Sequence, residues 1–172
     1  MSEIKLNYTI THLSNRVDEE KIKSFEESIG YSLPEDYKLF LEQHNYCTVF
    51  PNTFEAKSLI SEEQVVLDLR YLCGLKLKRN ILHACLEFKL EVFSNRIPGG
   101  LIAIGGVTGG LLLLGVSSKY YNKIFFWDRE FEFYDEYDPG TVDEHVSNLY
   151  FVSNSFNDFL SLLYEDDEDE EE

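Results

Sequence analysis

The chain has 172 residues, of which 44% are hydrophobic and 15% aromatic, enough for one domain that buries its core without disulfides or metals. It carries 15 basic and 32 acidic residues, a formal net charge of −17. This charge repels DNA, RNA and anionic lipid, so we expect binding to neither nucleic acid nor membranes. Basic proteins would be attracted, although the same charge could merely confer solubility.

The acidic residues are concentrated at the C-terminus. Residues 165–172 read EDDEDEEE, which leaves residues 1–164 with 15 basic and 24 acidic residues and a net charge of −9. A block of like charges repels itself and has no apolar surface to bury. We therefore predict a folded domain over residues 1–164 and a disordered acidic tail over residues 165–172.

Neither targeting nor metal binding is indicated. The start, MSEIKLNYTI, lacks the basic and apolar regions of a secretion signal, and no apolar run approaches the roughly 20 residues of a membrane span, so we expect a cytoplasmic protein. Cys47, Cys73 and Cys85 form an odd set without a CxxC pair, and His83 with Cys85 has poor metal-ligand spacing. The cysteines are predicted to fill the core, and no cofactor is expected.

Two helices are predicted in the first third of the chain. Before them, alternation over residues 4–10 favours a short strand, although a docked N-terminal arm would show the same pattern. The first helix follows Asp18, an available N-cap, and ends at Gly30, which suits a C-cap. The second helix has Pro34 in its first turn. Its predicted buried stripe consists of Tyr37, Phe40 and Leu41.

The middle of the chain is less regular. Residues 46–52 are turn-like, and residues 65–69 favour a strand. Residues 80–94 alternate in part like a strand, but their longer helical periodicity favours a helix, with Asn80 available to cap it. The apolar face of this predicted helix consists of Ile81, Cys85, Phe88 and Val92.

Three apolar runs between residues 97 and 130 predict the centre of the fold. Residues 101–104 and 111–116 are bounded by glycine pairs, and residues 123–127 follow a polar turn at 117–122. Runs this short between turn residues are typical of buried strands. We therefore predict a three-stranded antiparallel meander.

Two further elements are predicted after the meander. Residues 131–134 alternate like a strand before a turn at 138–140. Residues 155–164 favour a helix with four core-facing residues, Phe156, Phe159, Leu160 and Leu163. Together the elements predict an α+β domain, with a mixed or antiparallel sheet around a central meander and about four flanking helices.

The glycine-rich run GGVTGG at residues 105–110 is the motif that most suggests a nucleotide site. Phosphate-binding loops need backbone N–H groups at a helix N-terminus, and the Walker form also needs Gly-Lys-Ser/Thr. Here another strand follows, so we predict turns in the meander. Carboxylate pairs such as Asp128 with Glu130 have no evident partner histidine or lysine. We therefore expect the protein not to be an enzyme.

Four segments of the chain, taken together, resemble the SUKH superfamily, named from fungal Smi/Knr-type regulators. The segments are FExxIGxxLPEDYxxFLxxxN over residues 25–45, IPxGxIxIG over 97–105, IFFWDxE over 124–130 and SFxxFL over 155–160. The resemblance covers roughly residues 18–164. The family commonly has Asn-Gly-Gly after the second helix, whereas this chain has Asn45-Tyr46-Cys47, a departure that concerns the local turn rather than the fold.

The resemblance implies an α+β domain with a concave face that binds proteins. Bacterial members are typically immunity proteins that neutralise polymorphic or contact-dependent toxins, many of them nucleases, whereas fungal members are scaffolds in cell-wall signalling. A non-catalytic immunity protein, monomeric or weakly homodimeric, with a basic toxin as partner is therefore expected, and a signalling scaffold is the alternative. An enzyme acting on small molecules is the weakest alternative, because the sequence displays no pocket with a perturbed titratable group.

The partner-binding surface is predicted at the end of the meander. Exposed acids there would speed association with a nuclease, whose nucleic-acid groove must be basic. The alternative is that this segment keeps the fold, because Trp127 and Asp128 belong to the family pattern. The predicted interface residues are Asp128, Glu130, Glu132, Tyr134, Asp135 and Glu136.

Overall fold

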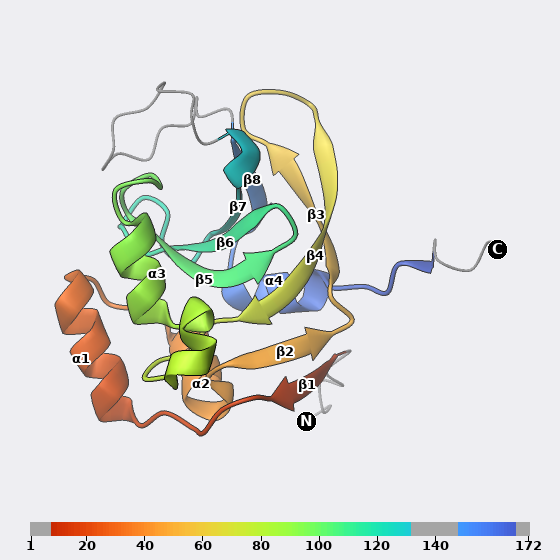
Figure 1. Ribbon diagram of the computed structural model, residues 1–172. Helices are drawn as coiled ribbons and strands as arrows, with labels where there is room; N and C mark the ends of the chain where they lie inside the picture. Colours follow the sequence, from red (N-terminus) through yellow and green to blue (C-terminus); the bar gives the residue numbers. More distant parts are fainter. Residues whose placement is uncertain (1–7, 132–147, 168–172) are drawn as a thin grey trace, which may run out of the picture.

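The computed structural model describes residues 8–131 and 148–167 (Figure 1). In these residues, eight antiparallel strands form one sheet: β1 (Thr9–His12), β2 (Cys47–Phe50), β3 (Thr53–Ser58), β4 (Gln64–Leu72), β5 (Leu101–Val107), β6 (Gly110–Gly115), β7 (Ile124–Asp128) and β8 (Leu149–Ser153). The helices are α1 (Glu19–Ile29), α2 (Glu35–His44), α3 (Leu86–Phe93) and α4 (Phe156–Leu162). Two short 3-10 helices are η1 (Arg79–Ala84) and η2 (Arg129–Phe131). The α+β prediction is confirmed.

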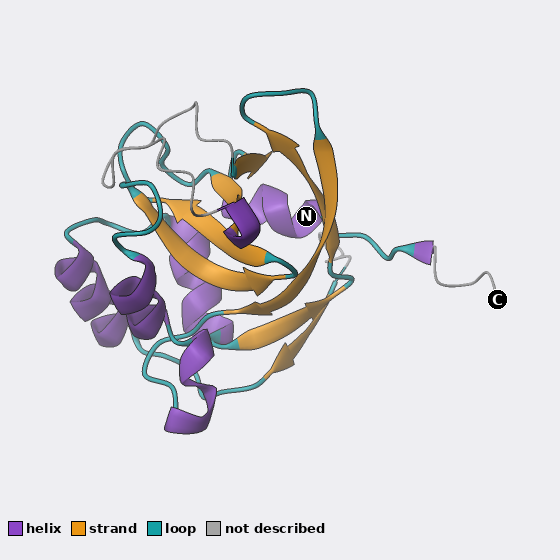
Figure 2. Cartoon of the chain, turned by 45° about the horizontal axis from the view of Figure 1, so that its top comes forward, coloured by secondary structure: helices purple, strands orange, loops and turns teal. Residues whose placement is uncertain are grey.

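The sheet curves until it meets itself. Its order is β1-β2-β4-β3-β8-β7-β6-β5, and β4 pairs additionally with β5. The long strand β4 makes this possible, because residues 64–68 pair with β3 and residues 69–72 pair with β5. Strands β3 to β8 therefore close a barrel-like ring, and Figure 2 shows the strands curving around one another. Strands β2 and β1 extend the sheet from β4.

The predicted meander is present as β5, β6 and β7, and it separates two apolar cores. On one face, Leu112 and Phe126 belong to the core that α1, α2 and α4 share. On the other face, Leu113 and Trp127 pack with Phe93 of α3. Successive side chains of a strand point to opposite faces. Burial on both faces therefore explains the continuous apolar runs of the sequence.

The predicted terminal signals of α1 are confirmed, and so are the predicted core residues of α2 and α4. The Asp18 side chain accepts a hydrogen bond from the Lys21 amide at 2.9 Å, and Gly30 ends α1 with φ of +75°. Pro34 lies one residue outside α2, as its N-cap, rather than within the first turn. All the predicted core residues of the last two of these helices, α2 and α4, are buried: Tyr37, Phe40, Leu41, Phe156, Phe159, Leu160 and Leu163.

Other predictions are wrong in the middle of the chain. Residues 46–52 contain the strand β2, and β3 and β8 were not predicted. The predicted helix over 80–94 is divided into η1 and α3, because the Leu86 amide donates to the Gly74 carbonyl and the Gly74 amide to the Ala84 carbonyl. These bonds hold Cys85 in an extended conformation. Asn80 is not the cap, and the buried face of α3 consists of Leu86, Lys89 and Phe93.

The glycine-rich run is mostly strand rather than turn. Gly105 and Gly106 lie in β5 and Gly110 in β6, so that only Thr108 and Gly109 connect the two strands. The predicted turn is thus a tight hairpin confined to these two residues. Gly109 has φ of +87°, a conformation that a residue with a Cβ rarely adopts.

Several predicted elements lie partly or wholly outside the described residues. The N-terminal strand is seen as β1 over residues 9–12, while residues 1–7 lie outside. Of the predicted strand at 131–134, the structure describes only Phe131, which belongs to η2. The predicted turn at 138–140 lies outside the described residues. Of the acidic tail, residues 168–172 lie outside, so its disorder stays a prediction. The three cysteines are buried and free, as predicted.

No helix within residues 8–131 and 148–167 has the length and apolar character that crossing a membrane requires. The same residues contain no group of three His, Cys, Asp or Glu side chains placed to hold a metal ion.

Candidate protein-binding site

Asp128, the first residue of the predicted interface, has a structural role at the end of β7. One oxygen of its carboxylate accepts a hydrogen bond from the Glu130 amide at 2.9 Å, which fixes the turn into η2. Its own amide donates to the Asn148 carbonyl at 2.9 Å. Burial raises the pKa of Asp128, and the hydrogen bond from the Glu130 amide opposes that shift. Asp128 is therefore partly a fold-keeping residue.

The other predicted interface residues divide into two groups. Glu130 is exposed on η2. Four residues lie outside the described part of the chain: Glu132, Tyr134, Asp135 and Glu136. The structure adds Glu63, from the loop between β3 and β4, whose negative charge contributes to the raised pKa of Asp128. We call Glu63, Asp128 and Glu130 the acidic edge.

A cavity of about 500 Å³ lies beside the acidic edge. Its cationic lining residues are Arg70 from β4, Lys89 from α3 and Arg129 from η2, and Glu130 lines it as well. We call this cavity the Lys89 pocket. It brings three positive charges together in a protein whose sequence is strongly acidic.

Lys89 is the unusual residue of this pocket, because its side chain is charged and only 7% of its surface is exposed. Its Nζ lies 5.6 Å from the ring centroid of Tyr71 and 5.5 Å from that of Phe93, within the range of cation–π contacts. No ion pair joins it to any carboxylate of residues 8–131 and 148–167. Burial lowers the pKa of Lys89 because it disfavours the charged form, and the Arg129 charge also lowers it.

The two aromatic rings are themselves held in place. A Cβ on Gly106 would lie 2.4 Å from an edge carbon of the Tyr71 ring, so a glycine is needed for this ring to lie against β5. The Tyr71 hydroxyl donates to the His83 carbonyl at 3.4 Å. Phe93 contacts Trp127 edge to face, with 6.0 Å between the ring centroids. The surroundings of Lys89 are therefore built from β4, β5, β7 and α3.

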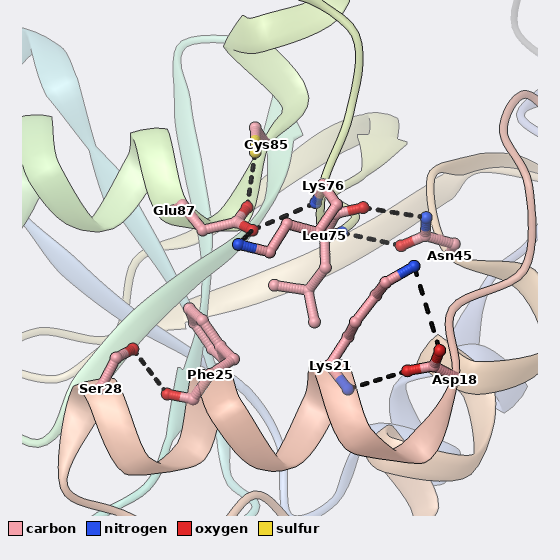
Figure 3. Close-up of polar contacts among 9 residues, drawn as sticks. All are labelled: Asp18, Lys21, Phe25, Ser28, Asn45, Leu75, Lys76, Cys85 and Glu87. Atoms are coloured by element: carbon pink, nitrogen blue, oxygen red, sulfur yellow. Dashed lines mark hydrogen bonds and ion pairs between the residues drawn. The ribbon is translucent and has the colours of Figure 1, made fainter.

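A second cavity, of about 430 Å³, lies between residues 13–17 and 75–81. Two of its lysines are paired: Lys21 with Asp18 at 4.0 Å and Lys76 with Glu87 at 3.7 Å (Figure 3). Glu87 also accepts hydrogen bonds from the Lys76 amide and the Cys85 thiol. This cavity therefore already supplies counter-charges to lysines that line it, whereas no ion pair among the described residues includes a cation of the Lys89 pocket.

Lys89→Met is expected to stabilise the free protein at pH 7 by about 1 kcal/mol, because an apolar side chain of similar length replaces a buried charge that no carboxylate of the described residues neutralises. The folded-state pKa of Lys89 lies below its ordinary value of 10.5, so the unfolded chain binds more protons between the two values. The free energy of unfolding of the wild-type protein therefore rises with pH between these two pKa values. The difference in stability between Lys89→Met and the wild type shrinks accordingly as pH approaches 10.5.

Urea unfolding of both proteins from pH 7 to 10.5 measures this difference. The matched control is Lys23→Met, which removes the same charge from an exposed position on α1 and should change stability by less than about 0.5 kcal/mol. A destabilised Lys89→Met protein would contradict the interpretation that burial of the Lys89 charge is unfavourable in the free protein.

Sequence reasoning missed the Lys89 pocket. Lys89 lies within the predicted helix over 80–94 but off its predicted apolar face. Arg70 stands in no motif, and Arg129 is the unspecified position of the segment IFFWDxE. The three residues come from separate elements, so no local spacing connects them. The only available signal was the alternation over residues 88–92, which places a lysine between apolar residues.

Comparisons with known proteins agree with this architecture. The chain is similar to the SPbeta prophage-derived uncharacterized protein YokK of Bacillus subtilis (strain 168), with 26% identity over 163 residues, covering 86% of this chain and 74% of that protein. The model of the SMI1 / KNR4 family (SUKH-1) matches residues 16–162. This match runs from the start of α1 to the end of α4 and includes every strand except β1. The chain therefore belongs to the SMI1 / KNR4 family (SUKH-1).

Proposed function

We propose that the protein is a non-catalytic immunity protein, which binds a cognate toxin protein in the cytoplasm and neutralises it. The observation that carries this proposal is the family match over residues 16–162, because SUKH proteins generally bind toxins. The relative in Bacillus subtilis is described as prophage-derived, so a domain of this kind also belongs to a mobile genetic element. A toxin and its antidote need to be inherited together, and such an element would carry both.

The charge of the protein supports a basic partner. Residues 1–164 carry a net charge of −9, and the acidic edge concentrates negative charge at one end of β7. Opposite charges raise the rate of association of two proteins, and a nuclease toxin must be basic where it binds nucleic acid. We therefore keep the predicted interface as part of the proposal, with its six residues Asp128, Glu130, Glu132, Tyr134, Asp135 and Glu136.

Co-expression with the product of the adjacent gene tests the function. Cells that express a toxin from that gene should survive only when this protein is present, and the two proteins should co-purify. Survival without the protein, or no rescue and no complex, would overturn the proposal. A complex with a partner that is not toxic would favour the signalling scaffold instead.

Reversing the charge of the acidic edge should slow toxin binding. The double variant Glu63→Lys with Glu130→Lys is expected to lower the association rate constant about 3- to 10-fold at low salt, and less at physiological salt, because exposed charges act mainly through steering. Stopped-flow mixing at two ionic strengths measures the effect. Glu27→Lys is the matched control, since it reverses an exposed charge on α1, away from η2 in Figure 1. Equal rates for all variants would remove the acidic edge from the interface.

A further inference from the structure

Within residues 8–131 and 148–167, no carboxylate pairs with the cations of the Lys89 pocket. Arg70, Lys89 and Arg129 line one cavity, and none of them pairs with a carboxylate of the described ranges 8–131 and 148–167. Glu130, on the rim, is not within ion-pair distance of any of the three. Gathering like charges in a partly desolvated cavity is unfavourable, and an added negative charge would relieve both the repulsion and the desolvation.

The geometry of the pocket suits a short acidic side chain. The Lys89 Nζ lies 5.6 Å from the ring centroid of Tyr71 and 5.5 Å from that of Phe93, and all three residues line the cavity. Tyr71, Phe93 and Leu111 give the cavity apolar walls, against which methylene groups would pack. Arg70 and Arg129 at the edge can each donate hydrogen bonds to a carboxylate in a bidentate manner.

The charge of the whole protein narrows the choice of anion. A polyanion such as a nucleic acid is repelled by a domain of net charge −9. A basic protein surface that carries a single carboxylate is attracted instead, because its basic residues face the acidic edge while the carboxylate enters the pocket. A positively charged pocket next to a negatively charged edge also fixes the orientation in which a partner binds, and it disfavours partners with a different charge pattern.

We propose that the Lys89 pocket receives an aspartate or glutamate side chain of the bound toxin, next to basic toxin residues that face the acidic edge. The proposal rests on the proposed function for the identity of the partner as a protein toxin. It makes Lys89 the central contact of the interface and the acidic edge its rim.

Binding of the toxin to variants of the full chain tests this assignment. Lys89→Met should weaken the affinity at least 10-fold, mainly through faster dissociation, because the toxin carboxylate would then be buried without its cation. Lys23→Met, which removes the same charge from α1, should change it less than 2-fold. Among Asp→Asn and Glu→Gln variants of the toxin, one should weaken binding to the wild type as much as Lys89→Met does. The same toxin variant should weaken binding to Lys89→Met no further.

Full affinity of Lys89→Met would overturn the pocket assignment while leaving the immunity function intact. If the wild-type protein binds no toxin, the proposed function fails, and the pocket is then tested alone. In that test the ¹⁵N-labelled full chain is titrated with acetate, against chloride at equal ionic strength. Saturable shifts of the Gly106 and Gly109 amides with acetate, lost in Lys89→Met, would support a carboxylate site. No shift would overturn it, and so would micromolar affinity for inorganic phosphate, which indicates a small-anion site.

Discussion

Replacing Asn45 with alanine is expected to destabilise the fold by about 3 kcal/mol, because several buried backbone groups would lose their partner. Asn45 is only 3% exposed. Its side-chain oxygen accepts a hydrogen bond from the Leu75 amide at 2.8 Å, and its amide group donates to the carbonyls of Leu75 at 3.2 Å and Asn15 at 3.0 Å. Figure 3 shows the Asn45 side chain between the end of α2 and the segment at Leu75.

Urea and thermal unfolding measure the loss, which at this chain length corresponds to a fall of about 6–12 °C in Tm. The matched control is Asn15→Ala, because Asn15 is exposed and takes part in this network only through its backbone carbonyl, which the substitution keeps. Asn15→Ala should cost less than about 0.5 kcal/mol. An equally small loss for both variants would show that the Asn45 network does not stabilise the fold.

The Asn45 network also explains a residue of the family pattern. Asn45 has φ of +49°, a conformation that asparagine tolerates better than most residues, so the chain turns from α2 into β2 without the glycines of other members. A Cβ on Gly74 would lie 2.5 Å from the Asn45 side-chain oxygen, so the position of the Asn45 side chain requires a glycine at residue 74. The segment that they hold leads into η1 and α3, and thereby positions Lys89.

Gly110→Ala is expected to cost about 3 kcal/mol or more, because the added Cβ would lie 1.9 Å from the Trp127 carbonyl oxygen. That oxygen belongs to the backbone of β7, so the two central strands would have to separate. Residue 110 also lines the Lys89 pocket, and the change should therefore alter amide resonances there. Urea unfolding and ¹⁵N NMR spectra of the purified variant measure both effects.

Gly109→Ala is the matched control in the same hairpin. A Cβ on Gly109 meets nothing within 4 Å, so that only its φ of +87° opposes the substitution. We expect a loss of about 1–2 kcal/mol, from backbone strain alone. A loss for Gly110→Ala that is no larger than the loss for Gly109→Ala would show that β6 and β7 can move apart at little cost.

The elements that the sequence predicts well are those whose signals are local. Asp18 and Gly30 mark the ends of α1 through bonds to their own helix, and Ser155 caps α4 through the Asp158 amide. The meander is recognisable because its strands are consecutive and its turn residues stand between them. In these elements the burial pattern, the caps and the turns all depend on neighbours in the sequence, and all three signals predict the same structure.

Predictions fail where distant partners decide the local structure. β2 is only four residues long and is followed by the turn residues Pro51 and Asn52, and β3 is largely polar. Both are strands because β4 supplies hydrogen bonds to each of them. The helix over residues 80–94 breaks at Cys85 because Gly74 bonds to the residues on both sides of it. Neither partner can be identified from periodicity, since hydrogen-bond pairing between strands leaves no spacing signal in one strand alone.

The amino-acid sequence by itself determined the fold class, the family pattern, the acidity that favours a basic partner, and the acids around Asp128. Only the tertiary structure decided which charges belong together. Asp128 became partly a structural residue because its carboxylate meets the Glu130 amide. Lys89 became the centre of a pocket because α3 buries it between Tyr71 and Phe93 and places it near Arg70 and Arg129. A lysine is predicted to be exposed until a particular packing desolvates it, and that packing depends on strands and helices far apart in the chain.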